Sequence, residues 1–305
     1  MRCSDVPLVS DLVARLTKVR ASDPGAVASA LAHRKRGRIQ FPRKIFLIAA
    51  DHTARGVMAA GGDVRAMADR GELLSRLQFA LSRPDVDGVL ATADIVDDLA
   101  LLGALDEMIV FGSMNRGGLA GSVFELDDRF TGYTASAIAR DGLTGGKMML
   151  RVADGDPATV RTMEACAVAI DELGGLGLPA MIEVFASRTV DGKTTNDMSI
   201  DATMRAIAVA SGLGGSSAHV WLKLPVVDDQ EQLLSATTLP VVLLGGDPGR
   251  DEEARDATYA KWARAMELPQ VRGLVAGRTL LYPPGGDVGA AVDRAASIVR
   301  VGVRA

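Results

Sequence analysis

Eight short apolar runs recur from residue 45 to the end of the chain, each followed by a turn signal and then a segment with helical periodicity. Runs of this length, bounded by turns, are typical of buried strands. A repeated strand-then-helix order predicts a parallel sheet. Two of the clearest helical segments are Pro157–Leu173 and Ser199–Ser211. The expected strands are Ile45–Ala50, Gly88–Ala91, Met108–Phe111, Met148–Val152, Ala180–Phe185, Val220–Leu224, Val241–Leu244 and Gly273–Ala276.

Eight such units predict one α/β domain, a single (β/α)8 TIM barrel that occupies residues 44–305. A doubly wound open sheet is the alternative fold. That fold usually has a glycine-rich dinucleotide turn after its first strand, whereas Asp51-His52-Thr53 follows the first strand here. Residues 1–43 form an N-terminal extension in which Val9–Val19 and Ala26–Leu31 look helical. We expect these helices to cap the bottom of the barrel.

Composition narrows the classes of partner. The 305 residues are 48% hydrophobic and 24% charged, as in a soluble globular protein. A net charge of -4 argues against a nucleic-acid surface. No apolar segment approaches the roughly 18 residues that span a bilayer, and the N-terminus lacks a signal-peptide core. The two cysteines, Cys3 and Cys166, suit a reducing cytosol, so we expect a cytoplasmic protein.

Lys223 is the candidate reactive group, because it lies inside the apolar strand Val220–Leu224. Burial disfavours the ammonium form and lowers the pKa of a lysine, and a neutral amine can attack a ketone to form a Schiff base. The alternative is a strand-end lysine whose stem packs while its ammonium group reaches water.

Strand alternation predicts which charged side chains converge with Lys223. Lys147 shares a strand face with Met149 and Arg151, and Glu183 is the one polar residue of Met181–Phe185. A buried carboxylate needs a cation, and both lysines can reach Glu183 from neighbouring strands. The arrangement fits proton transfer beside an amine nucleophile. An inert buried ion pair is the alternative.

Glycines follow the last two expected strands. Gly245 and Gly246 come after Val241–Leu244, and Gly277-Arg278 comes after Gly273–Ala276. Barrels often bind phosphate at these two positions, where glycine lets backbone N–H groups approach an anion and an arginine adds charge. Two ordinary turns that need glycine for backbone reasons are the alternative. We also expect Gly145-Gly146 to be a turn.

Metal and cofactor chemistry receive little support. The three histidines show no metal-ligand spacing, so neither a metal nor a cofactor is expected. His52 directly follows Asp51 at the end of the first strand, where it can orient Asp51 or meet the substrate.

Residues spread over five strand ends together resemble those of the class I (Schiff-base) aldolases. The most similar groups are tagatose-bisphosphate aldolases, sulfofructose-phosphate aldolases and archaeal-type fructose-bisphosphate aldolases. The chain also resembles an actinobacterial barrel group associated with inositol catabolism. The resemblance covers about residues 44–300. The matching segments are Ala49-Ala50-Asp51-His52, Lys147–Arg151, Ile182-Glu183-Val184, Trp221-Leu222-Lys223-Leu224-Pro225 and Gly277-Arg278.

The resemblance implies roles for individual residues. Lys223 matches the Schiff-base lysine, Glu183 the proton-transferring carboxylate, Lys147 the second lysine and Asp51 a substrate-contacting aspartate. Gly246, Gly277 and Arg278 match the phosphate cradle. The tyrosine that archaeal-type aldolases carry near Arg151 is absent, and so is the lysine-threonine-serine-threonine strand of deoxyribose-phosphate aldolases.

The implied function is cleavage of a phosphorylated keto sugar or keto sugar acid. The inositol association suggests 5-dehydro-2-deoxy-6-phosphogluconate, which would yield dihydroxyacetone phosphate and malonate semialdehyde, with Arg151 or Arg116 binding the carboxylate. Other ketose (bis)phosphates and deoxyribose phosphate are alternative substrates. A sugar-phosphate isomerase or epimerase with Glu183 as base and a non-catalytic phosphate-binding barrel are the rival functions. A homo-oligomer is compatible with the sequence, and no nucleic-acid or membrane partner is expected.

Overall fold

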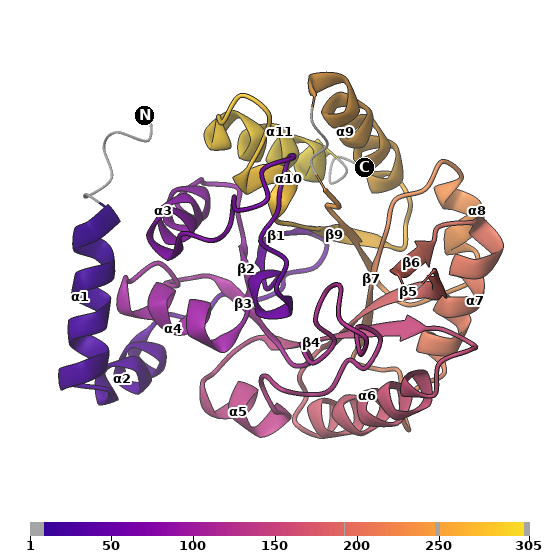
Figure 1. Ribbon diagram of the computed structural model, residues 1–305, viewed down its shortest axis with the longest axis horizontal. Coiled ribbons are helices and arrows are strands. Elements are labelled where there is room, and N and C mark those ends of the chain that lie inside the picture. Colours follow the sequence, from indigo (N-terminus) through magenta and orange to yellow (C-terminus); the bar gives the residue numbers. More distant parts are fainter. Residues whose placement is uncertain (1–8, 192, 248–250, 302–305) are drawn as a thin grey trace.

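The computed structural model describes residues 9–191, 193–247 and 251–301, so Cys3 lies outside the described residues. Eight parallel strands form a closed barrel surrounded by helices, which confirms the predicted (β/α)8 fold (Figure 1). In order around the barrel, hydrogen bonds join β4, β3, β2, β1, β9, β8, β7 and β5, and β5 pairs with β4 to close it. The strands are β1 (Ile45–Ala50), β2 (Gly88–Ala91), β3 (Ile109–Ser113), β4 (Gly145–Val152), β5 (Ala180–Val190), β7 (Val220–Leu224), β8 (Val241–Leu244) and β9 (Val271–Ala276).

Apolar side chains on the two faces of the strands build two separate cores. One face packs against the surrounding helices and forms the larger core. The other face fills the barrel interior, where Leu47, Leu90, Phe111, Met181 and Val242 pack together. Because both faces are buried, these strands are continuous apolar runs and can be recognised in the sequence.

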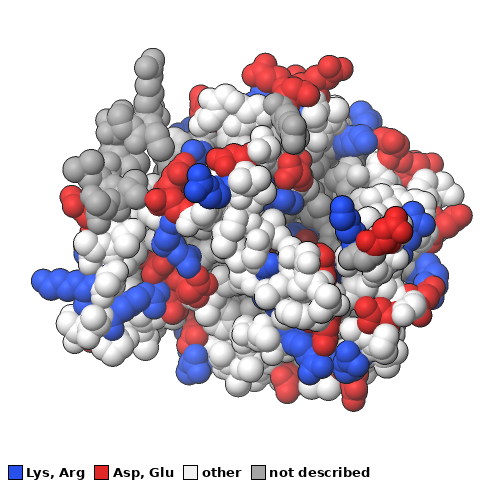
Figure 2. Space-filling model, in the orientation of Figure 1, with Lys and Arg blue, Asp and Glu red and all other residues white. Residues whose placement is uncertain are grey.

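The helices surround the barrel. They are α3 (Arg70–Leu81), α4 (Ala93–Leu101), α5 (Ala135–Arg140), α6 (Ala158–Gly175), α7 (Ile200–Ser211), α8 (Gln230–Leu234), α9 (Glu252–Met266), α10 (Arg278–Leu281) and α11 (Val288–Val301), with a 3-10 turn at Thr53–Arg55. None of the described helices is long and apolar enough to cross a membrane. On the face shown in Figure 2, acidic and basic side chains are interspersed.

The N-terminal helices do not lie where we expected. α1 (Val9–Ser22) and α2 (Gly25–His33) are present, but α1 packs against α3 and α2 against α4, at the side of the barrel (Figure 1). The bottom of the barrel is instead covered by the segment that follows α2. The Gly37 N–H bonds the carbonyl of Met108, just before β3, and Ile39 packs against the interior core.

One local expectation was wrong, and one element was not expected. Gly145-Gly146 is not a turn but the start of β4, and a Cβ at Gly146 would lie 2.5 Å from the Met114 sulfur. The glycines therefore allow close packing beside the strand. The second difference is a hairpin, because β5 continues beyond the barrel and pairs antiparallel with β6 (Lys193–Asp197). Its residues are mostly exposed, so no apolar run marked it.

A loop from Met114 to Thr134 runs between β3 and α5, and two buried side chains fix it to β4. The Asn115 amide accepts the N–H of Met149 at 2.6 Å and donates to the Met149 carbonyl at 2.6 Å. These bonds continue the ladder between the two strands beyond the end of β3. The Arg151 guanidinium binds both oxygens of the Asp128 carboxylate at 2.8 Å. The loop is thereby held at the C-terminal end of the barrel.

Replacing Asn115 by alanine should destabilise the protein without a large change in fold. The N–H and C=O of Met149 would both lose their partners while buried, which costs about 1–3 kcal/mol for each group. We expect the free energy of unfolding to fall by about 3 kcal/mol, measured by urea titration. Gln232→Ala, at an exposed position of α8, is the control and should change it by less than about 0.5 kcal/mol. Equal stability of the two variants would contradict this account.

Candidate active site

The register of three adjacent strands places a lysine, a carboxylate and a second lysine at neighbouring positions inside the barrel. Glu183 of β5 lies directly opposite Lys223 of β7. Lys147 of β4 lies opposite Met181, two residues before Glu183 on the same face. Lys147 is therefore one layer deeper, and Lys223 is nearer to the C-terminal mouth. Strand alternation predicted this convergence.

The Glu183 carboxylate bridges the two lysines. Its Oε1 lies 2.5 Å from the Lys223 Nζ, and its Oε2 contacts the Lys147 Nζ. The exposed fractions are 0% for Lys147, 3% for Lys223 and 8% for Glu183. A buried carboxylate with a cation on each oxygen is fully paired, which is the condition for burying charge at tolerable cost.

Asp51 extends this chain of charges on the β1 side. Its Oδ2 accepts a hydrogen bond from the Lys147 Nζ at 3.1 Å and another from the Ser113 hydroxyl at 3.1 Å. The Arg116 guanidinium also contacts Asp51, and its Nε donates to the Ser113 hydroxyl at 3.0 Å. Three cationic side chains, Lys147, Lys223 and Arg116, thus share two carboxylates. Deprotonating one amine would remove the excess positive charge.

Burial and neighbouring charges shift the pKa values of these groups. Desolvation is the main cause that lowers the pKa of Lys223 below its ordinary value, and the positive charge of Arg116 adds to the shift, while Glu183 opposes it. Desolvation likewise lowers the pKa of Lys147. For Glu183, burial alone would raise the pKa, but the positive charges of Lys147 and Lys223 hold it well below its usual range. Glu183 is therefore ionised at neutral pH.

His52 lies beside this chain of charges, near the start of α10. Its Nδ1 is buried and has no hydrogen-bond partner among the residues that the structure describes. Burial, with the positive charges of Arg278 and Lys223, lowers the pKa of His52 to about 3. The imidazole is consequently neutral and able to donate or accept a hydrogen bond.

The glycines after β8 and β9 have packing reasons of their own. A Cβ at Gly277 would lie 2.1 Å from the carbonyl oxygen of Ala49, and one at Gly245 would lie 2.7 Å from the Cβ of Ala276. Gly246 adopts a positive φ of 70°. Arg278 is held by Asp247 at 3.0 Å. These contacts explain the glycines without a ligand, so their role in binding phosphate stays a prediction.

Arg151 is engaged within the protein, and its partners could not be recognised in the sequence. Besides Asp128, it contacts the Glu125 carboxylate at 3.5 Å, and Glu125 also pairs with Arg55 at 3.5 Å. Glu125 and Asp128 lie in an irregular loop, where no periodicity indicates which way a side chain points. Arg116 was considered only as a ligand for a carboxylate, and its contact with Asp51 was not foreseen. A role for Arg151 in binding substrate stays a prediction.

The described residues assemble an amine beside an ionised carboxylate, with a second lysine and an arginine nearby. Such a group can add to a carbonyl, move protons and bind an anion. Among the same residues, no three His, Cys, Asp or Glu side chains come together as metal ligands.

Comparisons with known proteins agree with the fold. The family model described as Cgl0159-like matches residues 43–296. The crystal structure of Cgl0159 from Corynebacterium glutamicum is 48% identical, with a TM-score of 0.91 over 95% of this chain and 97% of that one. No curated protein matches.

Class I aldolase structures are more distant. A Schiff-base-forming fructose-1,6-bisphosphate aldolase is 16% identical, with a TM-score of 0.62 over 90% of this chain and 99% of that one. An archaeal fructose 1,6-bisphosphate aldolase is 17% identical, with a TM-score of 0.64 over 90% of this chain and 98% of that one. At these identities the likeness shows a shared fold. The family model, by contrast, matches residues 43–296, which is more than half of the protein, and the chain therefore belongs to the Cgl0159-like family.

Proposed function

We propose that this protein is a class I aldolase that cleaves a phosphorylated keto sugar or keto sugar acid through a Schiff base on Lys223. The observation that carries the proposal is the buried Lys223 amine 2.5 Å from an ionised carboxylate that also binds Lys147. The shared fold with Schiff-base-forming aldolases supports it.

The position of Lys223 favours it over Lys147 as the nucleophile. Both amines are buried, but Lys147 lies one layer deeper and contacts two carboxylates, whereas Lys223 contacts only Glu183 among the described acidic residues. A substrate that enters from the C-terminal mouth therefore meets Lys223 first. Lys147 serves to keep Glu183 ionised and in place.

The reaction then follows from the chemistry of an amine beside a base. The neutral Lys223 amine adds to the substrate ketone, and loss of water gives an iminium ion. Glu183 takes the proton from the hydroxyl of the departing carbon, the C–C bond breaks, and its electron pair moves to the iminium to give an enamine. An aldehyde leaves. Proton return to the enamine and hydrolysis of the new iminium release the second product and restore the lysine.

The remaining residues of the mouth would hold the substrate. Backbone N–H groups at Gly246 and Gly277, with the Arg278 guanidinium, would bind a phosphate between the ends of β8 and β9. His52 is neutral, and its Nδ1 has no partner within the described part of the chain, so it would hydrogen-bond a phosphate or hydroxyl oxygen next to this position. Asp51 would contact a substrate hydroxyl through its remaining lone pairs.

The proposed substrate is 5-dehydro-2-deoxy-6-phosphogluconate, which gives dihydroxyacetone phosphate and malonate semialdehyde. Its carboxylate needs a cationic partner. Arg116 contacts a single oxygen of Asp51, whereas Arg151 is bound to both oxygens of Asp128, so Arg116 is the better candidate. A coupled assay that detects dihydroxyacetone phosphate, run over a panel of phosphorylated ketoses and keto acids, tests this substrate against the others.

The two lysines give a matched test of the nucleophile. Borohydride added with dihydroxyacetone phosphate should increase the mass of the wild-type chain by one reduced triose phosphate, and peptide mapping should place it on Lys223. Lys223→Met should give no adduct. Lys147→Met should still give the Lys223 adduct, more slowly, because the nucleophile remains. An adduct on Lys147 would reject the Schiff-base assignment. So would the absence of any adduct on the folded wild-type protein, and the isomerase alternative would then remain.

The pH dependence of trapping should report the lowered pKa of Lys223. Only the neutral amine reacts, so the trapping rate should rise with pH and level off with a midpoint below 10.5, the ordinary value for lysine. In Glu183→Gln the carboxylate that opposes the shift is lost, so the midpoint should move to lower pH.

Turnover of Glu183→Gln should fall by about 10²–10⁴ because proton transfer is lost. A midpoint that stays at 10.5 in the wild type, or moves upward in the variant, would contradict the proposed electrostatics.

A further inference from the structure

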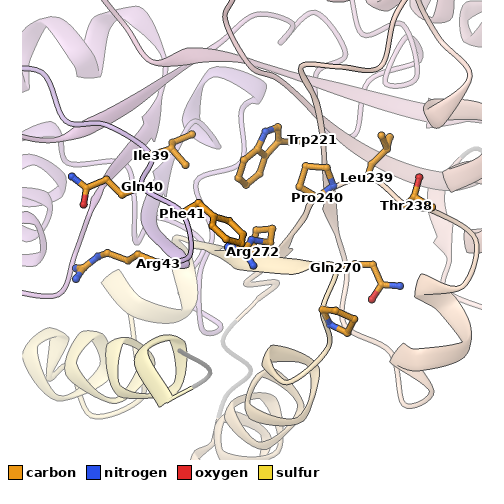
Figure 3. Close-up of a pocket in the computed structure, with 11 residues that line it drawn as sticks. Ile39, Gln40, Phe41, Arg43, Trp221, Thr238, Leu239, Pro240, Gln270 and Arg272 are labelled. Carbon is orange, nitrogen blue, oxygen red and sulfur yellow. The ribbon is translucent and has the colours of Figure 1, made fainter. Parts of the chain in front are cut away.

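A cavity of about 360 Å³ opens at the N-terminal end of the barrel, opposite the mouth that holds Lys223 (Figure 3). Its wall comes from the segment after α2, from the first residues of β7 and β9, and from the turns before β8 and β9. The volume lies in the range of pockets that hold small molecules.

The walls of this cavity, which we call the lower pocket, are mainly apolar and include two aromatic rings. Trp221 contributes its partly buried indole from β7, and Leu239 and Pro240 lie beside it. Phe41 is 85% exposed, so its ring adds apolar surface at the open edge of the cavity. Flat apolar walls of this kind suit a planar ring, which stacks on aromatic and proline surfaces.

A cation that has no carboxylate partner among the described residues lies at the edge of the lower pocket. The Arg272 guanidinium lies 4.7 Å from the centre of the Phe41 ring and donates one bond to the carbonyl of Pro42 at 2.9 Å. No ion pair joins it to any acidic residue that the structure describes, whereas its neighbour Arg43 is paired with Asp87 at 3.0 Å. The buried ammonium of Lys44 is close enough for Arg272 to lower its pKa further, so the local charge is positive.

The polar groups at the edge indicate which charge the occupant carries. An arginine has five N–H donors, and Arg272 uses one of them on Pro42. Among the described residues no hydrogen bond or ion pair uses the others, which can bind the two oxygens of one carboxylate, a geometry that guanidinium favours. Gln270 also lines the pocket, and its amide donates to the carbonyl of Leu234 at 3.4 Å.

We propose that the lower pocket is a binding site for a small aromatic carboxylate, with the ring between Trp221 and Phe41 and the carboxylate on Arg272. The site is distinct from the proposed active site. Trp221 lies opposite Met181 in the interior core, one layer below the pair of Glu183 and Lys223, so the packed interior of the barrel separates the two.

Fluorine NMR with 4-(trifluoromethyl)benzoate tests the site directly. The chain has two tryptophans, so protein labelled with 5-fluorotryptophan carries an internal control: Trp262 is buried on α9 and does not line the pocket. We expect the Trp221 resonance to shift with a dissociation constant of ~1 mM, as for a ligand of this size, while the Trp262 resonance stays in place. The isosteric 4-(trifluoromethyl)benzamide should bind at least ~5-fold more weakly, because it lacks the charge.

Three variants locate the binding. Arg272→Gln should remove the preference for the carboxylate over the amide. The control variant Arg264→Gln, on the exposed side of α9, should retain that preference. Lys223→Met should also keep it, which separates this site from the cationic mouth. The proposal is overturned if the Trp221 resonance does not move at ~10 mM probe. It is also overturned if the amide binds equally well, or if Lys223→Met abolishes binding.

Discussion

The Glu183 carboxylate, with Lys223 on one oxygen and Lys147 on the other, is the interaction on which the proposed chemistry depends. A lone carboxylate or a lone ammonium group inside a barrel would be too costly to keep charged. Together with Asp51 and Arg116 they form a chain in which every charge has an opposite neighbour. The barrel can therefore exclude water around an amine without leaving an unpaired ion.

This group of charged side chains is well suited to catalysis because it has one cation more than its carboxylates can balance. Loss of the proton from Lys223 leaves two cations, Lys147 and Arg116, for Asp51 and Glu183. Burial favours the neutral amine, while Lys147 keeps Glu183 ionised and ready to accept a proton. One environment thus lowers both pKa values. The lower pKa of Lys223 favours its neutral amine, and the lower pKa of Glu183 keeps it ionised.

Much of this arrangement could be predicted from the sequence because it rests on regular strands. Eight apolar runs predicted the barrel, and strand alternation alone brought Lys147, Glu183 and Lys223 together. What lies beyond strand ends could not be predicted. Arg116 reaches Asp51 from an irregular loop, and Arg151 binds Asp128 23 positions earlier in the chain.

The presence of a glycine in the sequence does not show whether the position is a turn or a site of close packing. Gly146 in β4 and Gly277 beside Ala49 are both sites of close packing. The hairpin of β5 and β6 is exposed and carries no apolar signal, and the lower pocket joins segments from four distant parts of the chain. Long-range contacts of this kind depend on the closed barrel, and no local sequence pattern predicts them.

The central claim is that the amine of residue 223 is the nucleophile and that the carboxylate of residue 183 serves it. A crystal structure of the protein reduced with borohydride in the presence of dihydroxyacetone phosphate tests this most directly. The account predicts continuous density from the Lys223 Nζ to the triose carbon, with Glu183 within hydrogen-bonding distance of the adduct. Density that joins the triose to Lys147, or an unmodified Lys223 with triose phosphate bound beside it, would contradict the account.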